Sequence, residues 1–150
     1  MSELRELYQE VILDHGKNPR NFRDALPGEQ TAKGHNPLCG DTIQVHVATE
    51  NGVIQDVAFH GEGCAISTAS ASMMTQFLKG RTLEEAETIF KSFHDLITGA
   101  VEPDTVLAGL GKLAVFAGVR EFPVRVKCAT LAWHTFKAAR DRSDQPASTE

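Results

Sequence analysis

The sequence predicts an α+β fold in which a small antiparallel sheet packs against several helices. Residues 42–60 alternate between apolar and polar side chains around a strong turn signal, which is typical of a hairpin. Helical spacing of apolar residues follows in the second half of the chain. The length of 150 residues suits one domain with its own core. Because the strands come first and the helices afterwards, the α+β class is favoured.

The N-terminal segment is expected to be a helix over residues 3–15 that ends near Gly16. Its apolar positions recur at helical spacing, at Leu4, Leu7, Val11 and Ile12. Residues 17–37 are rich in Pro, Gly, Asn and Asp, so we expect an extended loop there with a short strand near residues 30–34.

The hairpin is the most clearly marked local element. In DTIQVHVAT the side chains of Ile43, Val45 and Val47 share one face, and VIQDVAFHG supplies the second strand. The intervening Asn51-Gly52 pair is typical of a tight turn between antiparallel strands.

The second half of the sequence predicts helices. One follows GEGC, with a buried face at Ile66, Ala69, Ser70, Met73 and Phe77. Thr82 and Glu85 form a capping box that starts a helix extending to Ile97. Residues 98–118 suggest a short helix between loops, and Pro123 begins a last helix that runs to about Asp141. We expect one domain over residues 1–140 and a disordered polar tail over 141–150.

Composition narrows the class of function. The formal net charge of −5 argues against a nucleic-acid partner. No apolar run approaches the ~20 residues that cross a bilayer, and the charged start MSELRELYQE is unlike a signal peptide. We therefore expect a cytoplasmic protein with no membrane partner.

Three cysteines are an odd count for disulfides, so thiolate chemistry or metal binding is favoured. Cys39 lies in a loop with Asp41 two positions later, and Cys64 starts a helix, whose dipole favours a thiolate. Cys128 lies just over a turn into the last helix, behind Arg125 and Lys127.

Two interpretations of the cysteines remain open from the residues alone. Three thiolates and the Asp41 carboxylate would make a tetrahedral site suited to zinc, assembled by the fold because no CxxC pair is present. Alternatively, Cys64 and Cys128 are small buried apolar residues. Arg125 and Lys127 either offset the negative charge of such a site or lie in solvent. His35, beside the cysteine loop, is a candidate for contacting a metal ligand without binding the metal itself.

Four motifs in this order resemble the IscU/NifU-like family of iron–sulfur cluster assembly proteins, and most closely its SufU branch. They are DHGKNPRNF, NPLCGD, FHGEGCAISTASASMM and PVRVKCATLAW, which together span residue 3 to about residue 140 with the preceding helix. The resemblance implies an IscU/SufE-like fold. It also implies that Cys39, Asp41, Cys64 and Cys128 hold a common metal.

Three features separate the chain from IscU-type scaffolds. Lys127 stands where those scaffolds carry a histidine before the last cysteine, and a protonated lysine is a poor zinc ligand. The stretch EFPVR at residues 121–125 stands in place of their LPPVK chaperone-recognition motif. The segment 98–118 resembles the insertion of the SufU branch.

The resemblance therefore implies a zinc-dependent sulfurtransferase for iron–sulfur cluster biogenesis. It would accept persulfide sulfur from a SufS-type, pyridoxal-phosphate-dependent cysteine desulfurase and serve a downstream SufBCD-type scaffold. Cys39 is the expected acceptor, because its glycine-flanked loop can move. Arg125 and Lys127 would contact the desulfurase or balance charge. Two alternatives are an IscU-like scaffold that holds a transient [2Fe–2S] cluster on the same ligands, and a structural zinc module that binds a partner.

Overall fold

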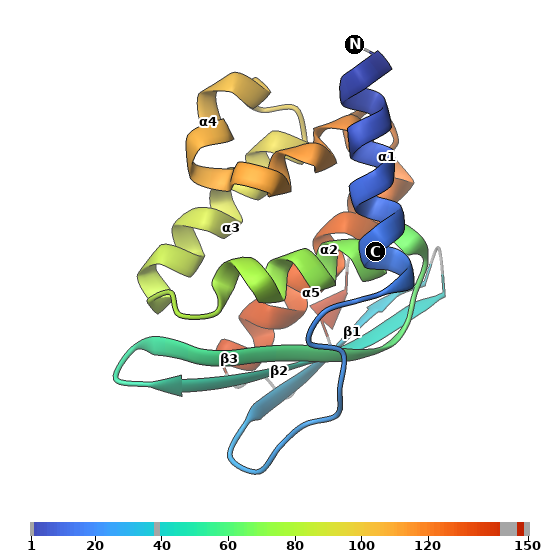
Figure 1. Cartoon of the computed structure of the whole chain (residues 1–150). Helices are drawn as coiled ribbons and strands as arrows, with labels where there is room; N and C mark the ends of the chain where they lie inside the picture. The colour runs from blue at the N-terminus through green and yellow to red at the C-terminus, as the bar shows by residue number, and fades with distance from the viewer. Residues whose placement is uncertain (1, 38–39, 142–146, 149–150) are drawn as a thin grey trace.

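The computed structural model describes residues 2–37, 40–141 and 147–148 of the chain. Figure 1 shows helices stacked over one face of a sheet. In chain order the elements are α1 (Ser2–Lys17), β1 (Gln30–Asn36), β2 (Asp41–Glu50), β3 (Val53–Glu62), α2 (Ala65–Leu78), α3 (Leu83–Ile97), α4 (Pro103–Leu110), the 3₁₀ helix η1 (Gly111–Glu121), α5 (Pro123–Arg140) and β4 (Ala147–Ser148). The predicted α+β class is confirmed. Within the described residues, no helix has both the length and the apolar character needed to cross a membrane.

The sheet has the strand order β3-β2-β1-β4. β1, β2 and β3 pair antiparallel, and the two-residue β4 pairs parallel to β1. The predicted hairpin is confirmed, because Asn51 and Gly52 both adopt positive φ between β2 and β3, as a tight hairpin turn requires. The predicted short strand is β1, which extends two residues further than expected, to Asn36.

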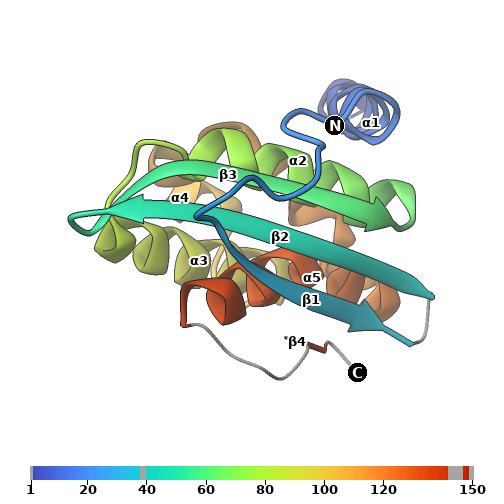
Figure 2. The same cartoon turned by 90° about the horizontal axis from the view of Figure 1, so that it is seen from below.

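Other segments of the chain pair with part of the outer side of β3 and with part of the outer side of β1. Along β3, the amide of Phe59 donates to the carbonyl of Asn21, and the amide of Arg23 donates to the carbonyl of Phe59. Figure 2 shows β4 beside β1, and in this pairing Gly34 lies opposite Ala147. At these positions the backbone N–H and C=O groups are already paired and are not open to another chain. Of the expected tail, the structure describes only Asp141 and these two residues of β4.

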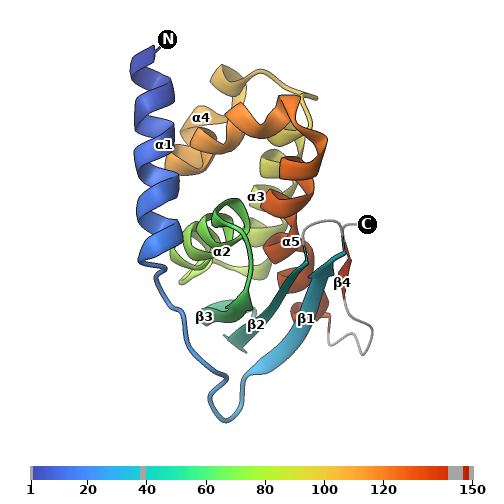
Figure 3. The same cartoon turned by 90° about the vertical axis from the view of Figure 1, so that its right-hand side faces the viewer.

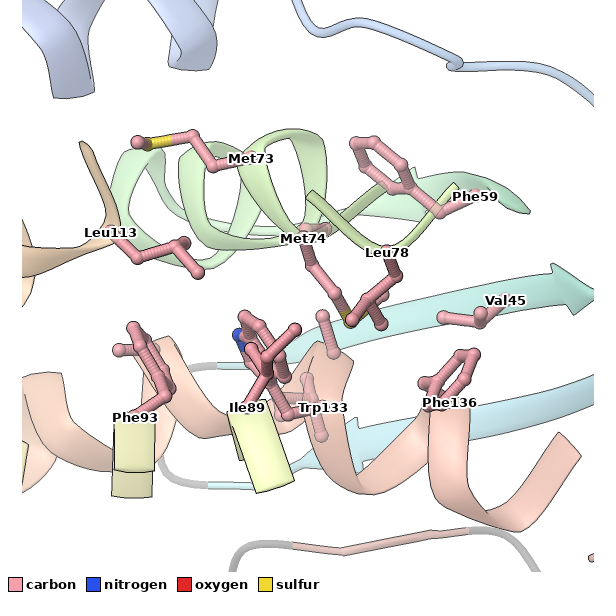
Figure 4. Packing of buried hydrophobic residues seen from close by; sticks show 14 of the residues in the cluster. Val45, Phe59, Met73, Met74, Leu78, Ile89, Phe93, Leu113, Trp133 and Phe136 are labelled. Atoms are coloured by element: carbon pink, nitrogen blue, oxygen red, sulfur yellow. The ribbon is translucent and has the colours of Figure 1, made fainter. Parts of the chain in front are cut away.

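The core lies between the sheet and the helices (Figures 3 and 4). Trp133 of α5 stacks on Phe93 of α3 with 4.6 Å between ring centroids. The Trp133 indole N–H donates to Ser70 Oγ, which itself donates to the carbonyl of Ala129. These contacts fasten α5 to both α2 and α3, so the position of α5 is set by aromatic packing and by paired polar groups.

The helix α2 is buried on more sides than one apolar face predicts. Its buried residues are Ser67, Ala69, Ser70, Ala71, Ser72, Met73, Met74, Thr75 and Leu78. The reason is that α1 packs on one side of α2, while α5 and β3 pack on others. A helix that is packed on several sides has small buried residues around its whole circumference. The single apolar face predicted from the sequence therefore accounts for only part of the buried surface of α2.

The expectation of one short helix between loops over residues 98–118 was wrong. The structure has α4 and then the 11-residue 3₁₀ helix η1. Within η1, Leu113, Phe116 and Val119 are buried and recur every third residue. A 3₁₀ helix has three residues per turn, so this spacing keeps the three side chains on one face, toward the core.

Gly34 allows β1 to approach α5 closely. A Cβ at this position would lie 1.9 Å from Thr135 Oγ1, and Thr135 is buried and donates to the carbonyl of Leu131. The side chain of Thr135 therefore has little freedom to move away. A larger residue at position 34 must push the strand and the helix apart.

We expect Gly34→Ala to lower the free energy of unfolding by about 1–3 kcal/mol, as overpacking of a core does. Thermal unfolding followed by circular dichroism measures the loss. Adding Thr135→Ala removes the oxygen atom in the way and should recover part of it. Gly109→Ala is the matched control, because a Cβ there meets nothing within 4 Å. An unchanged melting temperature for Gly34→Ala would contradict the argument.

Candidate metal centre

Three segments of the chain meet at one end of the sheet. There β1 leads into β2, and β3 leads into the first turn of α2 (Figures 1 and 2). Asp41 is the first residue of β2, and Cys64 is the N-cap of α2. α5 brings Cys128 to the same place from the far part of the sequence.

The carboxylate of Asp41 and the thiols of Cys64 and Cys128 form a cluster. One ligand atom from each of these residues lies within 4.8 Å of the others. Asp41 and Cys128 are buried and Cys64 is half-buried. The structure therefore brings together three of the four predicted ligands. The fourth, Cys39, lies outside the described residues, so its roles as ligand and as acceptor stay predictions.

Hydrogen bonds hold the acid and one thiol at the start of α2. The Cys64 amide donates to Asp41 Oδ1 over 2.9 Å, and Cys64 Sγ lies 3.7 Å from Asp41 Oδ2. Cys64 has the extended backbone of an N-cap, and its sulfur accepts from the Ser67 amide at 3.4 Å. A sulfur in this place meets the free N–H groups and the positive end of the helix dipole.

The thiol of Cys64 is activated relative to an ordinary cysteine. The hydrogen bond with Cys128 is the largest cause that lowers the pKa of Cys64, to about 7, and the Ser67 amide lowers it further. Burial and the negative charge of Asp41 raise the same pKa and only partly offset these hydrogen bonds. A thiol of this kind is readily deprotonated, as a metal ligand must be.

Cys128 receives a contact that sequence reasoning missed. Asn36, the last residue of β1, is fully buried, and its Nδ2 lies 3.7 Å from Cys128 Sγ. The only sequence signal was its place in NPLCGD. His35, which was expected to contact a metal ligand, lies beside the cluster, with its Nδ1 3.1 Å from the carbonyl oxygen of Asp41.

The residues present fit a thiophilic metal. Two thiols and a carboxylate match the sulfur and oxygen ligands that zinc takes, and thiolates also hold iron–sulfur clusters. In addition, Ser67 Oγ is buried and has no hydrogen-bond partner among the described residues. A Cβ on Gly63 would lie 3.1 Å from this oxygen and 3.5 Å from Asp41 Oδ1, so the hydroxyl lies near the acid. The Ser67 hydroxyl is therefore able to donate a hydrogen bond at the edge of the cluster.

The two predicted basic residues lie on the first turns of α5. Arg125 is exposed, and its guanidinium carbon lies 4.5 Å from the centroid of the Phe122 ring. Lys127 is half-buried. Neither forms an ion pair with another residue in the described part of the chain. Their predicted roles in docking or charge balance remain predictions.

A second polar cluster on the sheet was also missed by the sequence reasoning. His46 Nε2 lies 2.8 Å from His60 Nδ1 across β2 and β3, with the two rings stacked. His60 Nε2 lies 3.1 Å from Asp24, and Thr31 Oγ1 lies 2.7 Å from His46 Nδ1. Every ring nitrogen of this pair thus has a partner within the fold, which indicates a structural role away from the thiols.

In the metal-free protein, we expect alkylation of Cys64 by iodoacetamide to increase with pH around a midpoint of about 7, because the thiolate is the reactive form. Mass spectrometry of the labelled peptide measures the rate. Asp41→Asn should move the midpoint lower still, since the charge of Asp41 raises the pKa of Cys64. A midpoint near the ordinary value of 9.0 would contradict the assignment.

Comparison with known proteins places the chain in a family. Residues 7–139 match the NifU-like N terminal domain. The chain is 43% identical over 132 residues to the zinc-dependent sulfurtransferase SufU of Bacillus subtilis, covering 88% of each protein. It is 41% identical over 143 residues to the iron–sulfur cluster assembly scaffold protein IscU of Streptococcus pyogenes, covering 95% of this chain and 88% of the relative.

A solved structure gives the same result. The crystal structure of a protein from Fervidobacterium islandicum, described as an iron–sulfur cluster assembly scaffold for the SUF system, superposes with a TM-score of 0.81. The two share 31% sequence identity, over 89% of this chain and 96% of that one. The chain therefore belongs to the NifU-like N-terminal domain family of iron–sulfur cluster assembly proteins, which includes SufU and IscU.

Proposed function

We propose that this protein is a zinc-dependent sulfur carrier that takes persulfide sulfur from a cysteine desulfurase for iron–sulfur cluster biogenesis. The observation that carries the proposal is the convergence of Asp41, Cys64 and Cys128 in one cluster. The similarity to a relative named as a zinc-dependent sulfurtransferase supports it. So does Lys127, which stands before Cys128 where a scaffold would offer a histidine ligand.

Zinc would be held by Asp41, Cys64 and Cys128, with Cys39 as the fourth ligand. When bound, it would keep the thiols of its ligands deprotonated at neutral pH. Asp41 and Cys64 are already fastened to each other through the Cys64 amide, and Cys128 lies on a helix packed into the core. These three residues are therefore suited to stay in place while Cys39 reacts.

Cys39 is the proposed sulfur acceptor. Its thiolate attacks the terminal sulfur of the persulfide on the desulfurase cysteine. A new S–S bond forms at Cys39, the S–S bond on the desulfurase breaks, and the desulfurase cysteine leaves as a thiolate. One thiolate is consumed and one is released, so no external oxidant or reductant is needed. The sulfur then passes to a SufBCD-type scaffold, the proposed downstream partner.

Arg125 is the proposed contact for the desulfurase. Its exposed guanidinium lies on the same helix as Cys128, within one turn of it, and its neighbours Phe122 and Val124 are large apolar side chains that are also exposed. A patch that combines a cation with apolar surface is typical of a protein interface. Lys127, which directly precedes Cys128 in the sequence, would balance the negative charge of the thiolates.

A scaffold for a transient [2Fe–2S] cluster is the second candidate function. It is favoured by the same donor set, because thiolates hold such clusters, and by the similarity to IscU of Streptococcus pyogenes. Protein purified without oxygen distinguishes the two. Stoichiometric zinc and no visible absorption bands support the carrier, whereas a brown protein with charge-transfer bands supports the scaffold.

A structural zinc module that only binds a partner is the third candidate. In that case the site would be closed to reaction. Alkylation with zinc bound would then leave Cys39 unlabelled, and desulfurase turnover would not respond to the protein. An increase in turnover on adding the protein argues against this candidate.

Cys39→Ser should abolish uptake of sulfur from desulfurase plus cysteine, measured as persulfide by mass spectrometry. Asp41→Ala is the matched comparison, because it keeps all three thiols. It should weaken zinc retention and lower the melting temperature, since a metal bound only by the folded protein stabilises it. Uptake at the wild-type level by Cys39→Ser would exclude Cys39 as acceptor.

Arg125→Ala should weaken stimulation of the desulfurase while zinc stays bound. Arg81→Ala is the control, because Arg81 also lies over an aromatic ring, that of Phe77, with 4.9 Å to its centroid. Both variants lose one charge and one cation–π contact, so a general effect of charge would appear in both. Desulfurase turnover is measured against protein concentration. If Arg125→Ala stimulates turnover as fully as the wild-type protein, Arg125 is not a contact for the desulfurase.

A further inference from the structure

We propose that Asn36 is a positioning residue of the metal centre, whose side-chain amide donates a hydrogen bond to Cys128 Sγ and orients that sulfur toward the metal. The inference deepens the proposed function and rests on its metal site, though not on sulfur transfer. Asn36 Nδ2 lies 3.7 Å from the sulfur, and both residues are buried. The contact joins the end of β1 to α5 across 92 residues of sequence.

The backbone of Asn36 joins the same site to the sheet. Asn36 is paired with Asp41 in the register of β1 and β2. Its carbonyl accepts a hydrogen bond of 2.9 Å from the amide of Gly40, the residue after Cys39. Asn36 therefore contacts the loop, lies opposite the carboxylate residue and reaches a thiol from another element. A shift of this one residue would move three parts of the site relative to one another.

An amide is well suited to this place. Three thiolates and a carboxylate carry more negative charge than a divalent metal neutralises, so donors to sulfur stabilise the loaded site. The side chain of asparagine supplies N–H groups and carries no charge of its own, whereas an aspartate would place another anion beside the sulfur. Groups that hydrogen-bond to metal ligands orient them and tune their strength as donors to the metal.

The thiols of Cys64 and Cys128 are held in the same way, by a hydrogen bond from an N–H group. The sulfur of Cys64 accepts from the Ser67 amide, and the sulfur of Cys128 accepts from Asn36. Each sulfur is held by an N–H group from well-packed structure. The two thiols are therefore fixed ligands, in agreement with the assignment of transfer to Cys39.

Asn36→Ala and the nearly isosteric Asn36→Asp test this role. We expect each to lower zinc affinity by about 10–100-fold in competition with a chromophoric chelator, which is the usual effect of losing such a partner. In the cobalt-substituted protein, Asn36→Ala should move the thiolate-to-cobalt charge-transfer band to longer wavelength. The reason is that a sulfur without the N–H donor releases its electrons more readily.

Ser70→Ala is the matched control for a merely structural effect. It removes two buried hydrogen bonds between α2 and α5, one donated to the carbonyl of Ala129 and one accepted from the Trp133 indole, and none to sulfur. It should lower the melting temperature and leave the cobalt band in place. If Asn36→Ala keeps the wild-type band and zinc affinity, or if Ser70→Ala moves the band equally, the proposal is overturned.

A measurement on the unaltered protein covers the case in which the Asn36 variants fail to fold. With the magnetically active isotope of cadmium in the site, a hydrogen bond to Cys128 Sγ transmits a scalar coupling between cadmium and the Asn36 amide protons. Detection of this coupling supports the proposal and its absence overturns it. None of these readouts uses a desulfurase, so a failure of sulfur transfer at Cys39 would leave the result for Asn36 intact.

Discussion

The candidate metal centre depends on the close packing of α5 against the sheet and α2. Cys128 belongs to this helix, and no local motif links it to the other candidate ligands. Gly34 allows β1 to pack closely against Thr135 of α5. On another side of α5, Trp133 stacks on Phe93 of α3. Because protein interiors are packed as tightly as crystals, a helix fixed in this way has little freedom to slide or turn. The position of one sulfur is therefore set by contacts of the whole core.

The second requirement at this end of the sheet is electrostatic. An acid and two thiols are gathered where water is largely excluded, and such groups are costly to bury unless they have partners. Besides one another, the three groups have neutral N–H partners among the described residues: the Cys64 amide for Asp41, the Ser67 amide for Cys64 and the Asn36 side chain for Cys128. Neutral donors stabilise the deprotonated ligands without competing with a metal for them.

Membership of the family narrows the chemistry to iron–sulfur cluster assembly, and the relatives include both a sulfurtransferase and scaffolds. The same donors can serve either purpose, so the difference must come from what surrounds them. In this chain a cation, Lys127, directly precedes Cys128, and η1 leads into α5 through Phe122. Both features lie beside Cys128 on the same stretch of chain, so they are the places to look for that difference.

Much of the local structure could be predicted, because it depends on neighbouring residues. The period of two in β2, the Asn51-Gly52 turn and the capping box at Thr82 are all present in the structure. The helix η1 was missed because the period of three in its buried residues was not recognised. The enclosure of α2 was missed because it arises from α1 and α5, which no pattern within α2 reports.

The sequence by itself determined the α+β class, the hairpin and the family, and through the family the set of four candidate ligands. Spacing alone left those ligands open, because residues far apart in a chain can meet only through the packing of the elements that carry them. The tertiary structure decided that Asp41, Cys64 and Cys128 share one place. It also decided that Asn36 is the residue beside the buried sulfur, since that contact exists only when α5 is packed against the end of β1.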